Sequence, residues 1–259
     1  MNRFTQLFAD KHHKVFIPFF TLGDPHPEAS MTLIKATIDA GVEALELGMP
    51  FSDPVADGPT NQRSMERALK AGATFDVCLD MLHEIRAYAP KVAMGLLMYY
   101  NLIHRRGLDK ACSELKAAGI DALLAADVPL EESAELEAVL ADKDIGFVHF
   151  IAPNTPDQRI AILDPHITGY YYVLSGYGVT GAKKDIDPRT IDRVKHIRRT
   201  TEKPLVVGFG ISDPSHVHAI WNAGANAAIV GSKFSSLIEA NLTNLATAQE
   251  AIVAFTKAV

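Results

Sequence analysis

The chain has 259 residues, of which 48% are hydrophobic, so it can bury a large core as two small domains or as one large α/β domain. Its 25 lysines and arginines against 31 aspartates and glutamates give a net charge of −6, with no basic run of the kind that binds a phosphate backbone. We therefore expect no nucleic-acid partner. The two cysteines, Cys78 and Cys112, form no C-x-x-C pair, which indicates neither a disulfide framework nor a zinc site and fits a reducing cytoplasm.

The N-terminal segment, MNRFTQLFADKHHK, places Phe4, Leu7 and Phe8 at helical spacing. It lacks the continuous apolar core of a signal peptide, and no later apolar run approaches the roughly 18 residues that span a bilayer. We expect a short helix packed on the body of a cytoplasmic protein with no membrane partner.

Eight short apolar runs without strict alternation follow, a pattern typical of strands that are covered on both faces. Three of them begin with the Ala-Gly of a helix end and finish at a Gly or Asp where a loop should start. In chain order the runs lie in residues 14–20, 40–48, 92–99, 118–127, 146–152, 170–175, 204–210 and 223–232.

Amphipathic stretches lie between these runs, with apolar residues three or four positions apart. Examples are residues 28–40, 108–118, 131–141 and 188–199. Strand and helix therefore alternate along the chain, and no linker or low-complexity stretch marks a domain boundary.

Eight strand-helix units in this length predict a single (β/α)8 TIM-barrel domain spanning residues 1–259. We expect it to carry the extra N-terminal helix and additional helices near the second and eighth strands. An open doubly wound sheet is the alternative, but the even spacing of the units favours closure. Catalytic chemistry in such a barrel belongs at the carboxyl ends of the strands and in the loops that follow them.

Three late loops are rich in glycine: residues 175–182, 208–214 and 230–234. Glycines let backbone N–H groups approach an anion, and Gly231-Ser232 opens a predicted helix whose N-terminus adds free donors and a positive dipole end. A single loop of this kind is more often a tight turn. Three in succession, after the last three strands of a barrel, predict a phosphate cradle.

The stretch ELGMPFSDPVADGPT, residues 46–60, places Glu46 at the end of an apolar run. Side chains alternate along a strand, so Glu46 shares a side with Val42 and Ala44 and can point into the barrel mouth. Burial there would raise its pKa, which suits a group that takes and gives a proton near neutral pH. The competing reading, a strand-end glutamate paired with a lysine or arginine, stays open on these residues alone.

Other aspartates near strand ends have a simpler reading. Asp53 and Asp57 lie in Ser-Asp-Pro and Asp-Gly-Pro, both ordinary turn tripeptides. Asp57 has the better functional claim, because a loop that returns over the barrel mouth can place its carboxylate opposite Glu46. Asp127, after the fourth strand, is a third candidate, with turn formation as its alternative.

Several absences narrow the chemistry. No H-E-x-x-H motif occurs, and only His149 lies near a strand end, so we expect no metal site. No lysine lies within the sixth strand run, where some barrel aldolases keep a Schiff-base amine, although Lys183 and Lys184 follow in the loop. Acid/base chemistry by carboxylates on a phosphorylated substrate remains.

Several segments together resemble the tryptophan synthase alpha chain family, in the family's order from about residue 4 to about residue 240. P-F-S-D-P-x-A-D-G-P is the most specific of these motifs. The matching segments are FIPFFTLGDP (16–25), ELGMPFSDPVADGPT (46–60), GLLMYYN (95–101), GVTGA (178–182), GFGIS (208–212) and IVGS (229–232).

The resemblance implies a carbon–carbon lyase that cleaves indole-3-glycerol phosphate to indole and D-glyceraldehyde 3-phosphate in the last steps of L-tryptophan biosynthesis. The family's catalytic acids fall on Glu46 and Asp57. Glu46 would protonate indole C3 and then take the proton of the glycerol hydroxyl, while Asp57 would accept the ring N–H.

The resemblance also assigns the substrate-binding residues. The phosphate site falls on the backbone of Gly181, Gly210, Gly231 and Ser232. Thr180 lies in the loop that closes over the substrate. The indole pocket falls on four apolar residues: Phe19, Leu97, Tyr172 and Phe209.

Two positions depart from the family pattern. Asn61 stands where an aliphatic residue commonly lies beside the indole site, and Gly176 stands where a side chain, frequently arginine, is common. Gly176 with Gly178 should make the loop more flexible, so that closure is weak without a partner.

That partner, by resemblance, is the tryptophan synthase beta chain in an alpha2beta2 heterotetramer. The beta chain carries pyridoxal phosphate and receives indole through a tunnel, whereas this chain should carry no cofactor. The Asp53-Pro54 turn and the Tyr100-Asn101 loop match segments that face the partner.

Two other functions are weighed. A sugar-phosphate epimerase or isomerase on the same barrel would share the phosphate cradle, but many such epimerases need metal-binding His and Asp at strand ends, which are not evident here. A purely regulatory subunit would act through its exposed loops, and the intact Glu46 and Asp57 argue against it.

Overall fold

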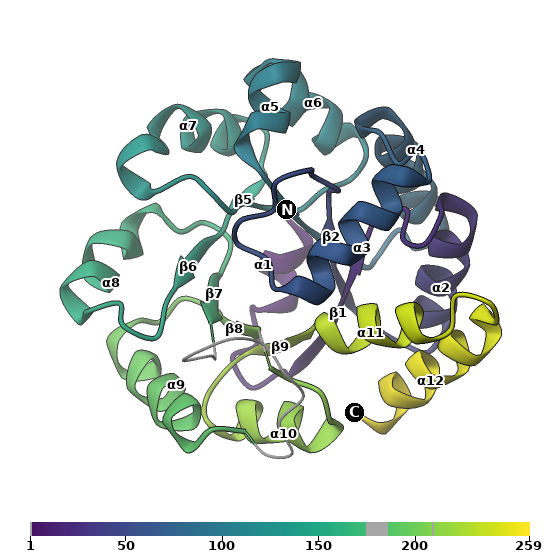
Figure 1. Cartoon of the computed structure of the whole chain (residues 1–259). Coiled ribbons are helices and arrows are strands. Elements are labelled where there is room, and N and C mark those ends of the chain that lie inside the picture. The colour runs from purple at the N-terminus through teal and green to yellow at the C-terminus, as the bar shows by residue number, and fades with distance from the viewer. Residues whose placement is uncertain (1, 175–185, 209) are drawn as a thin grey trace.

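The computed structural model describes residues 2–174, 186–208 and 210–259. Nine parallel strands in this part of the chain form one sheet inside a ring of helices (Figure 1). The strands are Val15–Thr21 (β1), Ala44–Gly48 (β2), Ala93–Met98 (β3), Ala122–Ala125 (β4), Gly146–Phe147 (β5), His149–Ile151 (β6), Tyr171–Leu174 (β7), Leu205–Gly208 (β8) and Ala227–Val230 (β9).

The order of the strands is that of a nearly closed barrel. β1 pairs with both β2 and β9, and the order runs β5-β4-β3-β2-β1-β9-β8-β7-β6. The two ends of that order, β5 and β6, are consecutive in the chain: β5 pairs with β4, and β6 pairs with β7. The expected single strand at 146–152 is thus two short strands that change partner at Val148, and the barrel rather than the open sheet is confirmed.

The helices follow the strands in the expected alternation. They are Arg3–Leu7 (α1), Pro27–Asp39 (α2), Pro59–Lys70 (α3), Phe75–Tyr88 (α4), Tyr100–Arg106 (α5), Leu108–Ala117 (α6), Ala134–Asp142 (α7), Asp157–Leu163 (α8), Pro188–Thr200 (α9), Pro214–Asn222 (α10), Ser232–Ala240 (α11) and Leu245–Ala258 (α12), with 3-10 turns at Leu130–Glu132 and Asp164–His166. The expected N-terminal helix is α1, and the expected extra helices are confirmed by the pairs α3–α4 after β2 and α11–α12 after β9. A further extra helix, α5, precedes α6 and was not anticipated.

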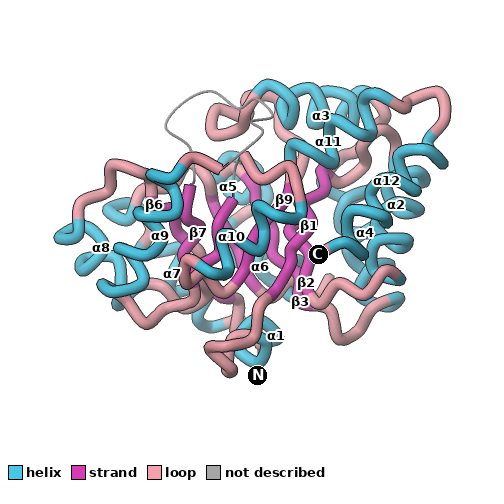
Figure 2. The backbone as a smooth tube through the Cα atoms, turned by 90° about the horizontal axis from the view of Figure 1, so that it is seen from below, coloured by secondary structure: helices cyan, strands magenta, loops and turns pink. Residues whose placement is uncertain are grey.

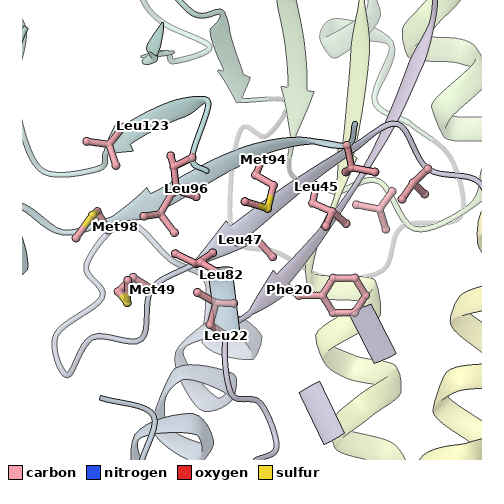
Figure 3. Close-up of a cluster of buried hydrophobic side chains, with 14 of the residues drawn as sticks. Phe20, Leu22, Leu45, Leu47, Met49, Leu82, Met94, Leu96, Met98 and Leu123 are labelled. Atoms are coloured by element: carbon pink, nitrogen blue, oxygen red, sulfur yellow. The ribbon is translucent and has the colours of Figure 1, made fainter. Parts of the chain in front are cut away.

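Alternate residues of each strand face opposite sides, which gives the barrel an interior and an outer layer. The outer layer packs against the helices, as Figure 3 shows for Leu45 and Leu47 of β2, Leu96 of β3 and Leu82 of α4. The interior holds a second cluster of alternate strand residues, including Ile17, Phe19, Ala44, Leu97, Leu124, Tyr170, Tyr172, Val206 and Ile229. The expectation that Val42 shares the side of Glu46 is wrong, because Val42 precedes β2 and packs in the outer layer.

The helix α1 closes the barrel at the amino ends of the strands, at the end opposite to α3 and α11 (Figure 2). Phe4 of α1 is buried and its ring centroid lies 5.1 Å from that of Tyr170 in the interior. Arg3 donates to Asp121, just before β4, at 2.9 Å. The open end of the barrel is therefore the carboxyl end, where the site is expected.

Candidate active site

A pocket of about 610 Å³, counted with its opening to solvent, lies at the carboxyl ends of the strands. Several predicted site residues that are distant in sequence meet there. Its lining consists of Phe19, Ala56, Asp57, Gly58, Thr60, Asn61, Leu97, Phe150, Tyr172, Gly210, Ile211, Ile229, Gly231 and Ser232.

Asp57 is held on the rim of this pocket by the loop between β2 and α3. Tyr99, which follows β3, donates its hydroxyl to Asp57 Oδ2 at 2.6 Å and accepts the N–H of Ala56 at 3.0 Å. The ring of Tyr99 stacks on Phe51 at 5.0 Å, which ties the start of the same loop. Burial raises the pKa of Asp57, and the hydrogen bonds from Tyr99 and Asn61 oppose that rise.

Glu46 lies inside the barrel on β2, level with Phe19 of β1 and Gly95 of β3, and is fully buried. Tyr170 donates its hydroxyl to Glu46 Oε2 at 2.5 Å, while Oε1 has no hydrogen-bond partner among the described residues. Burial raises the pKa of Glu46 to about 7, against the lowering effect of the Tyr170 bond.

The carboxyl of Glu46 does not reach the pocket in this conformation. It is directed at Tyr170, which packs on α1, and Glu46 is not among the residues that line the pocket. The sequence prediction of an inward-facing acid with a raised pKa agrees with the structure, but the expected position in the mouth does not. The alternative reading, a pairing with lysine or arginine, is also wrong, since the hydrogen-bond partner is a tyrosine.

Gly95 provides the space for this pair of residues. A Cβ atom at Gly95 would lie 2.6 Å from Glu46 Oε2 and 2.8 Å from the Tyr170 hydroxyl. Any larger residue would therefore push the carboxyl away from Tyr170.

The other acids near strand ends do not belong to the pocket. Asp127 is exposed and accepts the N–H of Tyr100 at 2.8 Å, where it serves the start of α5. Asp53 is exposed and accepts the hydroxyl of Ser52 at 2.5 Å. Turn formation is the better reading for Asp53, whereas Asp127 supports the start of α5.

One end of the pocket presents backbone rather than side chains. Gly231 is the N-cap of α11 and Ser232 its first residue, so N–H groups of the first turn face this end. Gly210 lines the same end with φ of +73°, a value that a larger side chain rarely adopts. Gly181, predicted as part of the cradle, lies outside the described residues, as do Lys183 and Lys184.

The apolar wall is formed by Phe19, Leu97 and Tyr172, three of the four predicted indole-site residues. Tyr172 can lie against β8 because Gly208 has no side chain: a Cβ there would lie 2.2 Å from the tyrosine hydroxyl. Phe209, Thr180, Gly176 and Gly178 lie outside the described residues.

Among the residues of the site that were not singled out from the sequence are Tyr99, Phe150, Tyr170 and Ile229. Phe150 meets Tyr172 edge to face at 5.3 Å and completes the wall. The two-residue spacing of Tyr170 and Tyr172, which puts both on one side of a strand, was an available signal. Nothing local marked Tyr99, because its partner Asp57 is 42 positions away.

Within the described ranges, no three His, Cys, Asp or Glu side chains are placed to hold a metal ion. No helix in the same part of the chain is long and apolar enough to cross a membrane. His149, the one histidine weighed as a ligand, is half-buried, and its Nδ1 contacts the carbonyl of Phe150 at 3.2 Å.

The fold and pocket define an enzyme of the (β/α)8 class with its site at the carboxyl ends of the strands. A family model described as tryptophan synthase alpha chain matches residues 4–259. A relative from Methanoregula boonei, named tryptophan synthase alpha chain, is 43% identical over 94% of this chain and 92% of its own. One from Cronobacter sakazakii with the same name is 41% identical over 99% and 97%.

Solved structures agree with these relatives. A chain from the tryptophan synthase a2b2 complex of Pyrococcus furiosus is 34% identical, with a TM-score of 0.87 over 94% of this chain and 96% of that chain. The tryptophan synthase subunit alpha of Legionella pneumophila is 28% identical, with a TM-score of 0.88 over 100% and 97%. The chain belongs to the tryptophan synthase alpha chain family.

Proposed function

We propose that this chain cleaves indole-3-glycerol phosphate to indole and D-glyceraldehyde 3-phosphate by a retro-aldol reaction, as the alpha subunit in the last steps of L-tryptophan biosynthesis. One observation carries the proposal: an apolar wall, a half-buried carboxylate and a helix N-terminus line the same pocket. These three features match the ring, the ring nitrogen and the phosphate of that substrate.

The phosphate is held at the N-terminus of α11. Backbone N–H groups near Gly231 and Ser232 and the positive end of the helix dipole favour a dianion there, with Gly210 adding close backbone approach. Gly181 and Thr180 are proposed to complete this end from their loop. The indole ring lies between Phe19, Leu97 and Tyr172, with Phe209 as a fourth contact.

Asp57 accepts the ring N–H and stabilises the positive charge that develops on the nitrogen when C3 is protonated. It must be ionised for this role. The hydrogen bonds from Tyr99 and Asn61 favour the ionised form against the effect of burial.

Glu46 transfers the protons. As the neutral acid it gives a proton to indole C3, and as the resulting carboxylate it takes the proton of the glycerol hydroxyl. The carbon–carbon bond then breaks, its electrons return to the indole ring, and an aldehyde forms. A pKa of about 7 suits a group that works in both directions. For this chemistry the carboxyl has to turn from Tyr170 toward the pocket.

We further propose that residues 1–259 act as one domain, that the reaction requires no cofactor on this chain, and that the protein is cytoplasmic. The a2b2 complex of the Pyrococcus furiosus relative supports a beta-chain partner in an alpha2beta2 assembly. Pyridoxal phosphate is expected in that partner alone. The Asp53-Pro54 turn and the Tyr100-Asn101 loop, in which Asp53 and Asn101 are exposed, are proposed to face the beta chain. The isolated chain is expected to be slower than the complex.

The test is indole release from indole-3-glycerol phosphate by the wild type, Glu46→Gln and Asp57→Asn, each alone and with the beta chain. Loss of a positioned proton-transfer group should lower kcat by about a hundred- to ten-thousandfold. Substitution of Asp142→Asn, whose side chain is 79% exposed on α7 and lies outside the pocket, is the matched control. Near-wild-type turnover in Glu46→Gln would sink the mechanism, and loss of indole release on addition of a chelator would show that the cleavage needs a metal ion.

A further inference from the structure

A short chain of hydrogen bonds joins Asp57 to the helix whose N-terminus faces the pocket. Ser235 of α11 donates its hydroxyl to Asn61 Oδ1 at 3.1 Å. Asn61 of α3 in turn donates Nδ2 to Asp57 Oδ1 at 3.4 Å. Ser235 is 3% exposed, and Asn61 and Asp57 are half-buried.

The direction of these bonds is fixed by chemistry. An ionised Asp57 has only acceptor atoms, so Asn61 must present its NH2 group to it. The amide oxygen then faces Ser235, whose hydroxyl must donate. If the bond from Ser235 is lost, the Asn61 amide is held only by its bond to Asp57 and is less firmly oriented.

The chain of bonds also connects two parts of the pocket. Ser235 lies in the first turn of α11, where its N–H bonds to Gly231 O at 3.1 Å. The helices α3 and α11 are further joined by Arg63, which donates to both oxygens of Glu239 at 2.7 and 2.8 Å. The first turn of α11 and the part of the pocket rim that carries Asp57 are therefore held together by direct contacts between α3 and α11.

We propose that Asn61 and Ser235 are positioning residues. They fix the position of the Asp57 carboxylate relative to a substrate phosphate bound at the start of α11. This inference rests on the proposed function, since it assigns the phosphate to α11 and the ring nitrogen to Asp57. Asn61 does not contact reacting atoms and acts through Asp57. The distance of 3.4 Å between Asn61 Nδ2 and Asp57 Oδ1 is long for a hydrogen bond, as such contacts often are without substrate. In this proposal the bond shortens when the bound phosphate draws α11 toward the loop that carries Asp57.

The polar residue at position 61 also acts on the protonation of Asp57. The titratable groups that interact with Asp57 in the described part of the chain are Tyr99, after β3, and Tyr172, on β7. Both are tyrosines and stay neutral at ordinary pH, so the neutral amide of Asn61 is a principal support of the ionised carboxylate beside Tyr99.

The experiment compares Asn61→Leu, Asn61→Asp and Ser235→Ala in the full chain with the beta chain present, measuring kcat, KM and their pH dependence. Asn61→Leu removes the amide, while Asn61→Asp keeps the shape and the acceptor for Ser235 but removes the donor. We expect kcat to fall by about three- to tenfold with KM changed by less than about twofold. The acid limb of kcat should move to higher pH by about half a unit in Asn61→Leu and by about one unit in Asn61→Asp.

Asn241→Leu is the matched control, because it makes the same chemical change at the other end of α11, where Asn241 bonds to Leu237 O. Ser235→Ala should lower kcat in wild type but not in Asn61→Leu, as a double-mutant cycle would measure. Unchanged kcat and acid limb in both Asn61 variants, or full additivity of Ser235→Ala with Asn61→Leu, would overturn the inference. If Asp57→Asn itself keeps full activity, the proposed role of Asp57 fails first, so the two failures are distinguishable. The thermal unfolding temperature of each variant shows whether a fall in kcat comes from unfolding or from a misplaced Asp57. Asn61→Asp is isosteric and Ser235→Ala removes only a hydroxyl, so both variants are expected to fold even if Asn61→Leu does not.

Discussion

Two of the buried acids of this barrel, Asp121 and Glu46, have opposite surroundings. Asp121, at the amino end, is 2% exposed and accepts from Arg3 at 2.9 Å, from Arg86 at 3.0 Å and from the Met94 N–H at 3.0 Å. Glu46, on β2, is 0% exposed and accepts only from Tyr170 among the described residues. One carboxylate is fully paired, and the other has an oxygen with no partner.

The difference distinguishes a structural acid from the acid proposed here to transfer protons. Asp121 joins α1, α4 and the start of β3, so its charge is used to hold the closed end of the barrel. No cation among the described residues compensates Glu46, and burial therefore raises its pKa to about 7. A barrel of this kind keeps stability at the amino ends of its strands and proton chemistry at the carboxyl ends.

The largest expected effect comes from breaking the paired acid. Asp121→Asn leaves Arg86, whose side chain is 14% exposed, without its charge partner. We expect a loss of about 3 to 5 kcal/mol in the free energy of unfolding, measured in urea, because an unpaired buried charge is costly. Asp142→Asn, at a side chain that is 79% exposed, is the control and should change stability by less than about 0.5 kcal/mol. A loss below about 1 kcal/mol in Asp121→Asn would show that the cluster is not a stabilising network.

Glu46→Gln should have the opposite effect on stability, and the effect should depend on pH. The folded chain holds a proton on Glu46 up to about pH 7, whereas the unfolded chain loses it near 4.5. The folded state therefore binds more protons between these values, and wild-type stability falls as pH rises through this window. Gln has no such titration and can still accept the Tyr170 hydroxyl.

The measurement is the free energy of unfolding of Glu46→Gln and wild type from pH 4 to pH 8. The difference should grow across the window and reach up to about 3 kcal/mol in favour of Gln at pH 8, while the variant loses activity. The slopes of other groups cancel in the difference. A pH-independent difference would mean that Glu46 titrates as an ordinary exposed acid.

The barrel itself was predictable from the sequence because its signal is local. Short apolar runs and three-to-four spacing report strand and helix directly, and both acids proposed for catalysis follow from strand-end position and motif. The division of residues 146–151 into β5 and β6 was not predictable, because both strands lie in one apolar run and only pairing with β4 and β7 separates them.

The residues that hydrogen-bond to the proposed site residues could not be predicted from the sequence, for a different reason. The contacts Tyr99–Asp57, Tyr170–Glu46 and Ser235–Asn61 join positions 42, 124 and 174 residues apart. Such pairs depend on which strand ends meet across the barrel, and periodicity carries no information about that. The position of the Glu46 carboxyl outside the pocket also depends on distant residues. Side-chain alternation along β2 places Glu46 inside the barrel, but the space at Gly95 and the hydroxyl of Tyr170 decide the direction of its carboxyl.

The smallest expected effect on stability is that of Tyr170→Phe, which tests the surroundings of Glu46 directly. Tyr170→Phe keeps the ring against Phe4 and removes the one hydrogen bond to the carboxyl, so the pKa of Glu46 should rise further, by up to about one unit. Stability should fall by only about 1 kcal/mol. Because the first proton transfer needs neutral Glu46, the basic limb of activity should move to higher pH.

The two kinetic constants should respond differently to Tyr170→Phe. The profile of kcat/KM reports the free enzyme, in which Glu46 contacts Tyr170, so its basic limb should shift. The profile of kcat reports the substrate complex, in which Glu46 has turned to the pocket, so it should not move. Tyr171→Phe is the control, because the neighbouring hydroxyl faces outward to Ile160 O and Asp164. Equal shifts in both profiles would mean that Glu46 keeps its bond to Tyr170 during the reaction, and that protonation occurs without the turn.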